Sequence, residues 1–218
     1  MAELVSIPIS YFELVVDYKE PNVRLWVDRA TVVQGLFNAF KPWDLNVDDV
    51  EVLTQGKLSE QGVKFKLPAK GISFFFGPAS CKFTRDDANW DALEETIQIL
   101  DAAISTLLNL GKAEKGSQKS MIALHLQLKT VPFREILKPF VPAQIAAIEA
   151  GSIMTAASVV KWDKRKITID GSGVVANAIF LRFEREFEGN ATYDDMAHRL
   201  KADEESLFEI LGIEEDRA

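Results

Sequence analysis

Apolar and polar positions along this chain repeat with two different periods, and the period changes at turn residues. Alternation with a period of two is typical of strands, whereas apolar positions three or four residues apart are typical of helices. In the first half the pattern predicts one strand, a helix, three strands and a long helix. The expected strands are Ile9–Tyr18, which Val23–Val27 extend or re-pair, Val50–Gln55, Val63–Leu67 and Ile72–Phe83, the last with a break at Gly77-Pro78. The expected helices are Thr31–Phe40 and Trp90–Leu110.

The second half repeats this plan after a glycine- and lysine-bearing linker at Gly111–Ser120. The alternation in Met121–Thr130 predicts a strand, and proline followed by apolar positions predicts two short helices. Three further strands and an acidic closing helix follow, with Gly212 as the helix stop. The expected elements are helices Pro132–Phe140, Pro142–Ala150 and Tyr193–Leu211, and strands Ile153–Trp162, Lys166–Asp170 and Val174–Phe187.

Many of these features recur after about a hundred residues. Gly71 is matched by Gly171 at that offset, the strand positions Lys82–Arg85 by Arg182–Arg185, and Leu100 by Leu200. Recurrence at one fixed offset indicates a tandem duplication. We therefore expect an α+β fold with a β-α-β-β-β-α module repeated about a pseudo-twofold axis, antiparallel sheets and helices packed on one face. The expected modules are residues 1–110 and 111–218, packed as one compact unit.

Charge and cysteine content narrow the class of protein. The 218 residues carry a net charge of −8, which opposes binding to the phosphates of nucleic acid. The acids are most concentrated from Glu186 to Ala218, where eleven face three bases, and this favours a basic protein partner. The single Cys81 excludes an intramolecular disulfide and a cysteine-rich metal site. With no basic, apolar leader and no long apolar run, we expect a cytoplasmic protein without a membrane partner.

A catalytic group is hard to assemble from these residues. His125 and His198 are the only histidines. His125 has no carboxylate near it in the sequence, and His198 has no second histidine four residues away. Cys81 is expected to face the core, away from any base. The paired acids lie where helices begin or on their outer faces, so capping explains them. We expect no catalytic residue, metal or cofactor, and an enzyme is the less favoured hypothesis.

Two sets of residues remain as binding candidates. The first set is basic and occupies matched positions on two equivalent strands. Because these residues alternate with Phe83 and Phe183, we expect them on the strand face opposite the two rings. Its members, which could hold an anionic ligand in a pocket between the modules, are Lys82, Arg85, Arg182 and Arg185. The second is aromatic and gives a strand phenyl rings on both faces, so that one face needs a second layer, either another module, a second subunit or a partner. These interface candidates are Phe74, Phe75, Phe76 and Phe180.

The order of elements resembles a sporadically distributed family of uncharacterised bacterial proteins of similar size. The likeness lies in Gly71–Phe83 running into the helix Trp90–Leu110, the strand Met121–Thr130 and the closing helix Tyr193–Leu211. The resemblance implies the duplicated fold and no particular activity. A sheet covered by a long helix is also similar, by analogy, to SecB-like export chaperones.

Two hypotheses for function follow. The first is a non-enzymatic protein-binding module, such as a scaffold, a chaperone-like protein or an antitoxin or immunity factor, that uses a sheet face or edge and that also forms homo-oligomers. The second is a binder of a small anionic ligand, or an enzyme, with its pocket between the modules.

Overall fold

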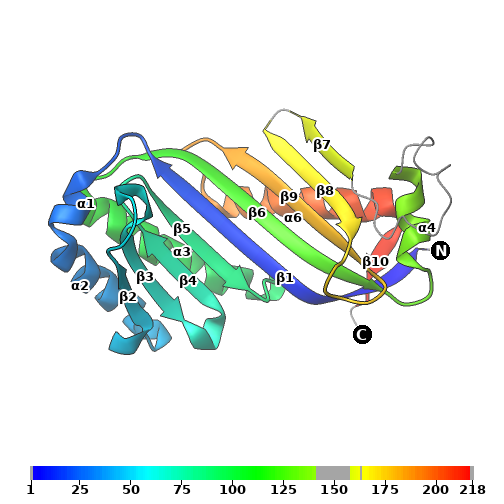
Figure 1. The fold of residues 1–218 in the computed structure, drawn as a ribbon, viewed down its shortest axis with the longest axis horizontal. Coiled ribbons are helices and arrows are strands. Elements are labelled where there is room, and N and C mark those ends of the chain that lie inside the picture. Colours follow the sequence, from blue (N-terminus) through cyan, green and yellow to red (C-terminus); the bar gives the residue numbers. More distant parts are fainter. Residues whose placement is uncertain (1, 141–157, 163, 217–218) are drawn as a thin grey trace. The chain divides into compact units, whose positions relative to one another are not determined.

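The computed structural model describes residues 2–140, 158–162 and 164–216 and shows a mixed α+β fold, an antiparallel sheet with helices (Figure 1). The strands are hydrogen-bonded in the order β2-β3-β4-β5-β1-β6-β9-β8-β7, and β10 runs parallel to the start of β1. The strands are β1 Glu3–Tyr18, β2 Val50–Leu53, β3 Gly62–Leu67, β4 Ile72–Phe76, β5 Ser80–Asp86, β6 Lys115–Leu128, β7 Ser158–Trp162, β8 Arg165–Gly171, β9 Ala178–Phe187 and β10 Ile213–Glu215.

The α-helices are α1 Val23–Val27, α2 Arg29–Phe40, α3 Leu93–Gly111, α4 Phe133–Leu137 and α6 Tyr193–Leu211. Short 3-10 turns connect several elements, and these are η1 Lys41–Trp43, η2 Val47–Asp49, η3 Leu58–Glu60, η4 Pro68–Lys70, η5 Trp90–Ala92 and η6 Lys138–Phe140.

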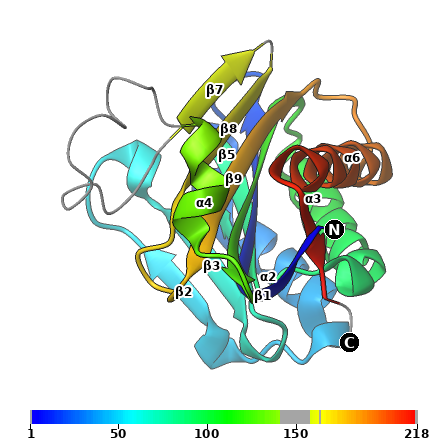
Figure 2. The same cartoon turned by 90° about the vertical axis from the view of Figure 1, so that its right-hand side faces the viewer.

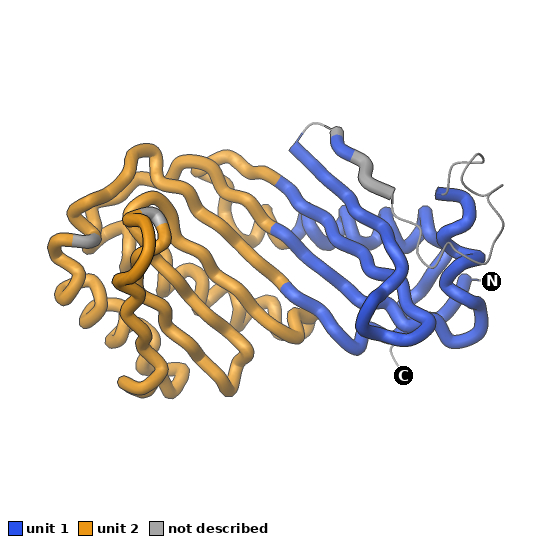
Figure 3. Tube along the Cα trace, viewed as in Figure 1, with its two compact units in different colours: residues 1–11, 121–185, 198–218 blue, residues 12–120, 186–197 orange. Residues whose placement is uncertain are grey.

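The chain forms two compact units, each built from both halves of the sequence (Figure 3). Unit 1 comprises residues 1–11, 121–185 and 198–218, and unit 2 comprises residues 12–120 and 186–197. The long strands β1 and β6 each contribute residues to both units, so the compact units do not coincide with residues 1–110 and 111–218. The equivalence of those two halves stays a prediction.

Unit 2 has its core between one face of β3–β5 and the helices α2 and α3, which lie on the same side of these strands (Figure 2). Alternate positions of the strands supply fully buried rings. Phe40 from α2 packs on two of them, with ring centroids 5.5 Å from Phe65 and 5.9 Å from Phe74. Leu100 of α3 is buried as the apolar stripe predicts. Burying such a side chain stabilises the fold by about 1.5–3 kcal/mol.

Unit 1 follows the same rule with β8, β9 and α6. Ile167, Ile169, Leu181 and Phe183 point to the buried face of the strands. Leu200 of α6 is also buried, as predicted. At the end of α6, Gly212 adopts φ +65°, a left-handed conformation that glycine reaches without strain.

Val23–Val27, expected to extend a strand, form the helix α1. The side chain of Asn22 accepts a hydrogen bond from the backbone N–H of Leu25 and caps this helix. Leu25 is buried, and a Cβ on Gly111 would lie 2.3 Å from its side chain. A helix cap and a tertiary contact therefore outweigh the β-branched composition of the segment.

The expected linker Gly111–Ser120 is wrong from Lys115 onward, because β6 begins there. Polar residues in this stretch have partners that the composition does not show. Gln118 is fully buried, and its side-chain amide donates to the backbone carbonyls of Glu188, Gly189 and Ala191. These bonds fix the turn before α6 and make a polar segment part of the sheet.

Two further differences concern the number of strands. The break expected within Ile72–Phe83 is a turn between two separate strands, β4 and β5, so the first half has one strand more than the predicted module. The short strand β10 was not predicted. The expected helix Pro142–Ala150 and the start of the strand Ile153–Trp162 lie outside the described residues.

Candidate functional site

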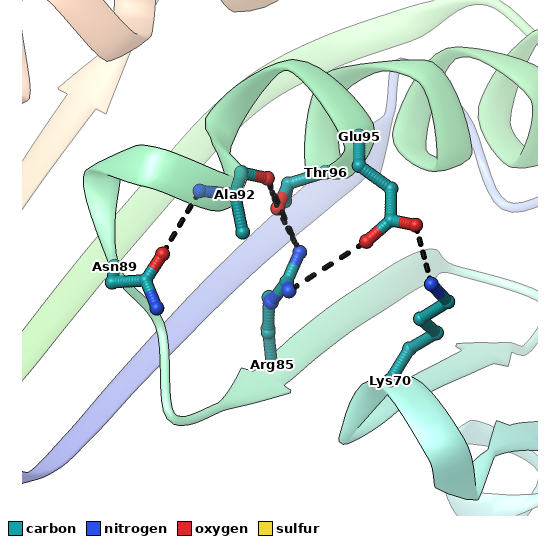
Figure 4. Close-up of polar contacts among 6 residues, drawn as sticks. All are labelled: Lys70, Arg85, Asn89, Ala92, Glu95 and Thr96. Atoms are coloured by element: carbon teal, nitrogen blue, oxygen red, sulfur yellow. Dashed lines mark hydrogen bonds and ion pairs between the residues drawn. The ribbon is translucent and has the colours of Figure 1, made fainter.

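Arg85, one of the predicted ligand residues, lies on the buried face of β5 and points toward the start of α3 (Figure 4). Its guanidinium donates to the backbone oxygen of Ala92 at 3.3 Å and to the hydroxyl of Thr96, and it lies 3.8 Å from the carboxylate of Glu95. The same carboxylate binds Lys70 at 2.6 Å. Arg85 therefore joins a strand end to the first turn of its own helix.

Arg185 has the corresponding role in unit 1. Its guanidinium lies 2.6 Å from the carboxylate of Asp203 in α6, and Arg165 of β8 lies 3.3 Å from the same carboxylate. The expectation that Arg85 and Arg185 face away from Phe83 and Phe183 is wrong. Residues two apart in a strand share a face, so each arginine lies on the ring side and meets a helix.

Lys82 and Arg182 lie on the opposite face, as predicted, and each has a carboxylate partner. Lys82 pairs with Glu13 of β1 at 2.8 Å, and Arg182 pairs with Glu184 at 3.1 Å. The four basic candidates thus divide between two faces and two units.

The predicted aromatic set also divides. Phe74 and Phe76 are each 1% exposed and pack in the core with Phe40 and Phe65, so they have no surface for a partner. Phe75 points to the other side of β4 and is partly exposed. Phe180 is likewise partly exposed on β9. Phe75 and Phe180 remain as interface candidates.

The ring of Phe75 packs against two glycines of the sheet. An added Cβ on Gly62 would lie 2.4 Å from this ring, and one on Gly77 would lie 3.4 Å from it. The ring therefore covers two glycines, which have no side chains of their own to protect the sheet at these positions. The ring therefore packs against the backbone at both positions.

Lysines flank this ring in the register of the sheet. Lys64 of β3 and Lys82 of β5 are the cross-strand neighbours of Phe75. In the next row Lys66 lies beside Ser73, and Ser73 lies beside Thr84. We call this face the Phe75 surface, and its members are Lys64, Lys66, Ser73, Phe75, Lys82 and Thr84. It is the partly exposed face of β3–β5, opposite α2 and α3, and Figure 1 looks onto it.

A second polar group surrounds His125 in unit 1. Its Nδ1 lies 2.8 Å from the hydroxyl oxygen of Ser172, and its ring centroid lies 5.0 Å from that of Phe180. Burial lowers the pKa of His125, which favours the neutral ring. A serine beside a neutral histidine resembles a nucleophile with its base. However, the Ser172 oxygen already accepts the backbone N–H groups of Val174 and Val175, so its lone pairs hold the turn in place.

The third group lies on the helix side of unit 2 and includes Lys115, a residue of the predicted linker. Its ammonium donates to the Tyr193 hydroxyl at 3.0 Å, and burial lowers the pKa of Lys115. Cys81 is buried as predicted, and burial raises the pKa of its thiol to about 12. The Tyr18 hydroxyl lies beside this thiol, but the buried hydroxyl has no hydrogen bond of good geometry. A protonated, inaccessible thiol is a poor nucleophile.

Among the described residues, no three histidine, cysteine, aspartate or glutamate side chains form a group that could hold a metal ion. In the same part of the chain, no helix is long and apolar enough to span a membrane.

Comparison with known proteins leaves the family open. No protein-family model matches the chain, and no curated protein matches it in sequence. The resemblance described above therefore rests on the order of elements alone.

Proposed function

We propose that this protein is a non-enzymatic binding module that holds a partner protein on the Phe75 surface. The observation that carries the proposal is the packing of the Phe75 ring over Gly62 and Gly77, which leaves the ring partly exposed. An aromatic ring that is fixed over Gly62 and Gly77 and left partly exposed presents apolar area without losing side-chain freedom when a partner binds. Aromatic anchors of this kind dominate the energy of many interfaces.

The burial pattern of the strands supports the same proposal. In unit 2 the core is complete on the helix side, where Phe65, Phe74 and Phe83 are each 1% exposed or less. Phe75 contributes nothing to that core. Its ring covers Gly62 and Gly77 on the other face of the sheet, and the part of the ring that stays exposed is available to a partner.

An anionic ligand at the four basic candidates is the less favoured alternative. Each of them already lies within 4 Å of a carboxylate, and the four pairs are Lys82–Glu13, Arg85–Glu95, Arg182–Glu184 and Arg185–Asp203. A ligand would have to displace these carboxylates and, at Arg85 and Arg185, also release a helix.

We also propose that the two halves of the sequence arose by duplication and are related by a pseudo-twofold axis. Two arginines support this. Arg85 and Arg185 lie a hundred residues apart, and each joins a long helix to the strand that precedes it in the sequence. The helix turns that they reach differ, so the test is superposition of residues 1–110 on 111–218 in a crystal structure, with Trp90–Leu110 and Tyr193–Leu211 in equivalent places. The cytoplasmic location and the formation of homo-oligomers stay predictions.

A comparison of captured proteins tests the proposed binding function. Wild-type protein, Phe75→Ser and Ile210→Ser are immobilised separately and incubated with lysate of the native host, and retained proteins are quantified by mass spectrometry. Ile210 is 66% exposed on α6, so its variant controls for loss of any exposed apolar side chain. We expect at least one protein to be retained by the wild type and by Ile210→Ser and to be lost with Phe75→Ser. If every retained protein is unaffected by Phe75→Ser, or is lost equally with both variants, the proposal is wrong.

A further inference from the structure

The strand β2 is an open edge of the sheet in unit 2 (Figure 1). It stands first in the hydrogen-bonded order, so among the described residues no strand pairs with the side of β2 that faces away from β3. A strand with one neighbour leaves half of its backbone N–H and C=O groups pointing outward, and such an edge can pair with a strand of another molecule. Proline, lysine or a bulge often protects an edge, but Val50–Leu53 contains no proline or lysine and pairs with β3 in continuous register.

Apolar side chains are exposed along this edge. Val52 lies on the face of β2 that points to the helix side of unit 2, yet it is 48% exposed, so the helices do not cover it. Val47 before the strand and Leu58 after it are 74% and 48% exposed. The one charged residue of β2 is Glu51, whose carboxylate lies 3.2 Å from Lys66 of β3. This carboxylate is therefore directed toward its own sheet, and the outward side of the edge is mainly apolar.

The sequence of β2 suits antiparallel pairing with an identical strand. Opposite residues in such a ladder lie on one face of the sheet, so a symmetric pair is centred on one residue of the strand. A pair centred on Glu51 would place two glutamates directly opposite each other, which is unfavourable. A pair centred on Val52 places this valine opposite its counterpart and Glu51 opposite Leu53 of the other copy. The start of each β2 then lies next to the end of the other, so Val47 of one copy approaches Leu58 of the second.

We propose that β2 pairs with β2 of a second copy of this chain, in the register centred on Val52, and forms a twofold-symmetric dimer. A symmetric pair uses the same edge twice and closes, as most homo-oligomers do. Its twofold axis is perpendicular to the sheet, so the two Phe75 surfaces lie on the same side. The second copy also continues this face beside Leu53, the cross-strand neighbour of Gly62. The dimer goes beyond the proposed binding function and does not depend on it.

Charge opposes this pairing, so backbone hydrogen bonds and apolar contacts must carry it. Each copy has a net charge of −8, and residues 47–60 hold four acids and one base. Because salt screens the repulsion between like charges, the dimer should be tighter at about 500 mM NaCl than at about 50 mM. The strand has only four residues, which makes the contact small beside a stable interface. We therefore expect a reversible dimer with a dissociation constant on the order of 10–100 μM.

Sedimentation velocity of the full-length protein tests whether the dimer forms. We expect the wild type to change from monomer to dimer between about 1 and 300 μM, and to do so at lower concentration in the higher salt. A wild type that is still monomeric at about 300 μM in about 500 mM NaCl would overturn the dimer and leave the proposed binding at Phe75 as it stands. A dimer that dissociates at high salt would be held by another, charged surface, and pairing through β2 would be wrong.

Charges introduced at position 52 test the register. Val52→Lys and Val52→Glu each place like charges opposite each other at the twofold axis, and we expect each to weaken the dimer by at least about fivefold. An equimolar mixture of the two places lysine opposite glutamate and should associate to within about twofold of wild type. The matched controls Ile210→Lys and Ile210→Glu make the same charge changes at a residue that is 66% exposed on α6, and they should also stay within about twofold of wild type. If the variants at both positions weaken the dimer equally, or if the mixture associates no better than its components, pairing centred on Val52 is refuted.

Discussion

Gly62→Ala is the substitution that links the stability of this protein most directly to its candidate site. Gly62 begins β3, and an added Cβ there would lie 2.3 Å from the backbone oxygen of Phe76 and 2.4 Å from the ring of Phe75. Ordinary van der Waals contacts of a Cβ lie at 3.4–4 Å. Both neighbours must therefore move by about 1 Å, and one of them is backbone held in the β3–β4 ladder.

Overpacking of this kind typically costs about 1–3 kcal/mol. For a chain of about this size, the cost corresponds to a fall in the melting temperature of roughly 2–12 °C. The Phe75 ring has the freer path, because it faces solvent on one side, whereas the carbonyl of Phe76 does not. We therefore expect Gly62→Ala to displace the ring and also to destabilise the sheet.

Circular dichroism during thermal and urea unfolding measures the loss, and Gly173→Ala is its control. An added Cβ on Gly173 meets nothing within 4 Å, so this variant should stay within about 0.5 kcal/mol of wild type. The double variant Gly62→Ala with Phe75→Ala removes the contact with the ring but keeps the contact with the Phe76 carbonyl. Gly62→Ala should therefore cost less stability in the Phe75→Ala background than in the wild type, but the cost should not disappear. If Gly62→Ala is as stable as Gly173→Ala, an added Cβ at Gly62 does not overpack the sheet, and the tight packing of Phe75 against Gly62 is refuted.

Three further predictions concern the core, a buried carboxylate and metal content. Leu100→Ala and Leu200→Ala should each cost about 2–5 kcal/mol in urea unfolding, and a loss below about 1 kcal/mol would show that these side chains do not support the core. Hydrogen bonds from the side chain and backbone of Thr130 hold the pKa of Glu3 below its usual value. The ionised carboxylate therefore stabilises the fold above the unfolded-state pKa, and this contribution is lost as the pH falls through the lower folded-state pKa. Glu3→Gln should be less stable than wild type at pH 7 and should lose less stability on acidification to pH 3, and identical pH profiles of the two proteins would contradict this. Elemental analysis of the purified protein should find no stoichiometric zinc or iron, since the chain has one cysteine and two histidines.

Periodicity was sufficient to predict the elements whose side chains alternate cleanly between core and solvent. The stripe from Leu93 to Leu107 predicted α3 because one face of that helix is buried along its length. Periodicity failed where a distant segment decides the local structure. Val23–Val27 form a helix because Leu25 packs near Gly111, and Lys115–Ser120 join the sheet because Gln118 bonds to three carbonyls some seventy residues away.

The candidate site was predicted only in part, for similar reasons. Alternation correctly gave Phe74 and Phe75 opposite faces, but it could not say which face the helices would cover. Nothing near Phe75 in the sequence indicated that its ring would cover Gly62, which precedes it by thirteen residues and lies on another strand. His125 and Ser172 likewise meet only because β6 and the turn after β8 come together in the folded chain.

The position of the basic residues within their strands decides which surface is free to bind. A strand exposes every second side chain, so Lys82 and Arg85, three residues apart, must lie on opposite faces of β5. The residue on the helix side becomes a helix anchor, because a buried guanidinium requires acceptors, and the backbone of Ala92, the hydroxyl of Thr96 and the carboxylate of Glu95 supply them. The residue on the other side, Lys82, stays partly exposed next to Phe75. The same alternation in β9 separates Arg182 from Arg185. The two basic residues of each strand therefore cannot form one shared anion site, and the exposed member, Lys82 on β5 or Arg182 on β9, lies on the face that also carries a partly exposed ring, Phe75 or Phe180.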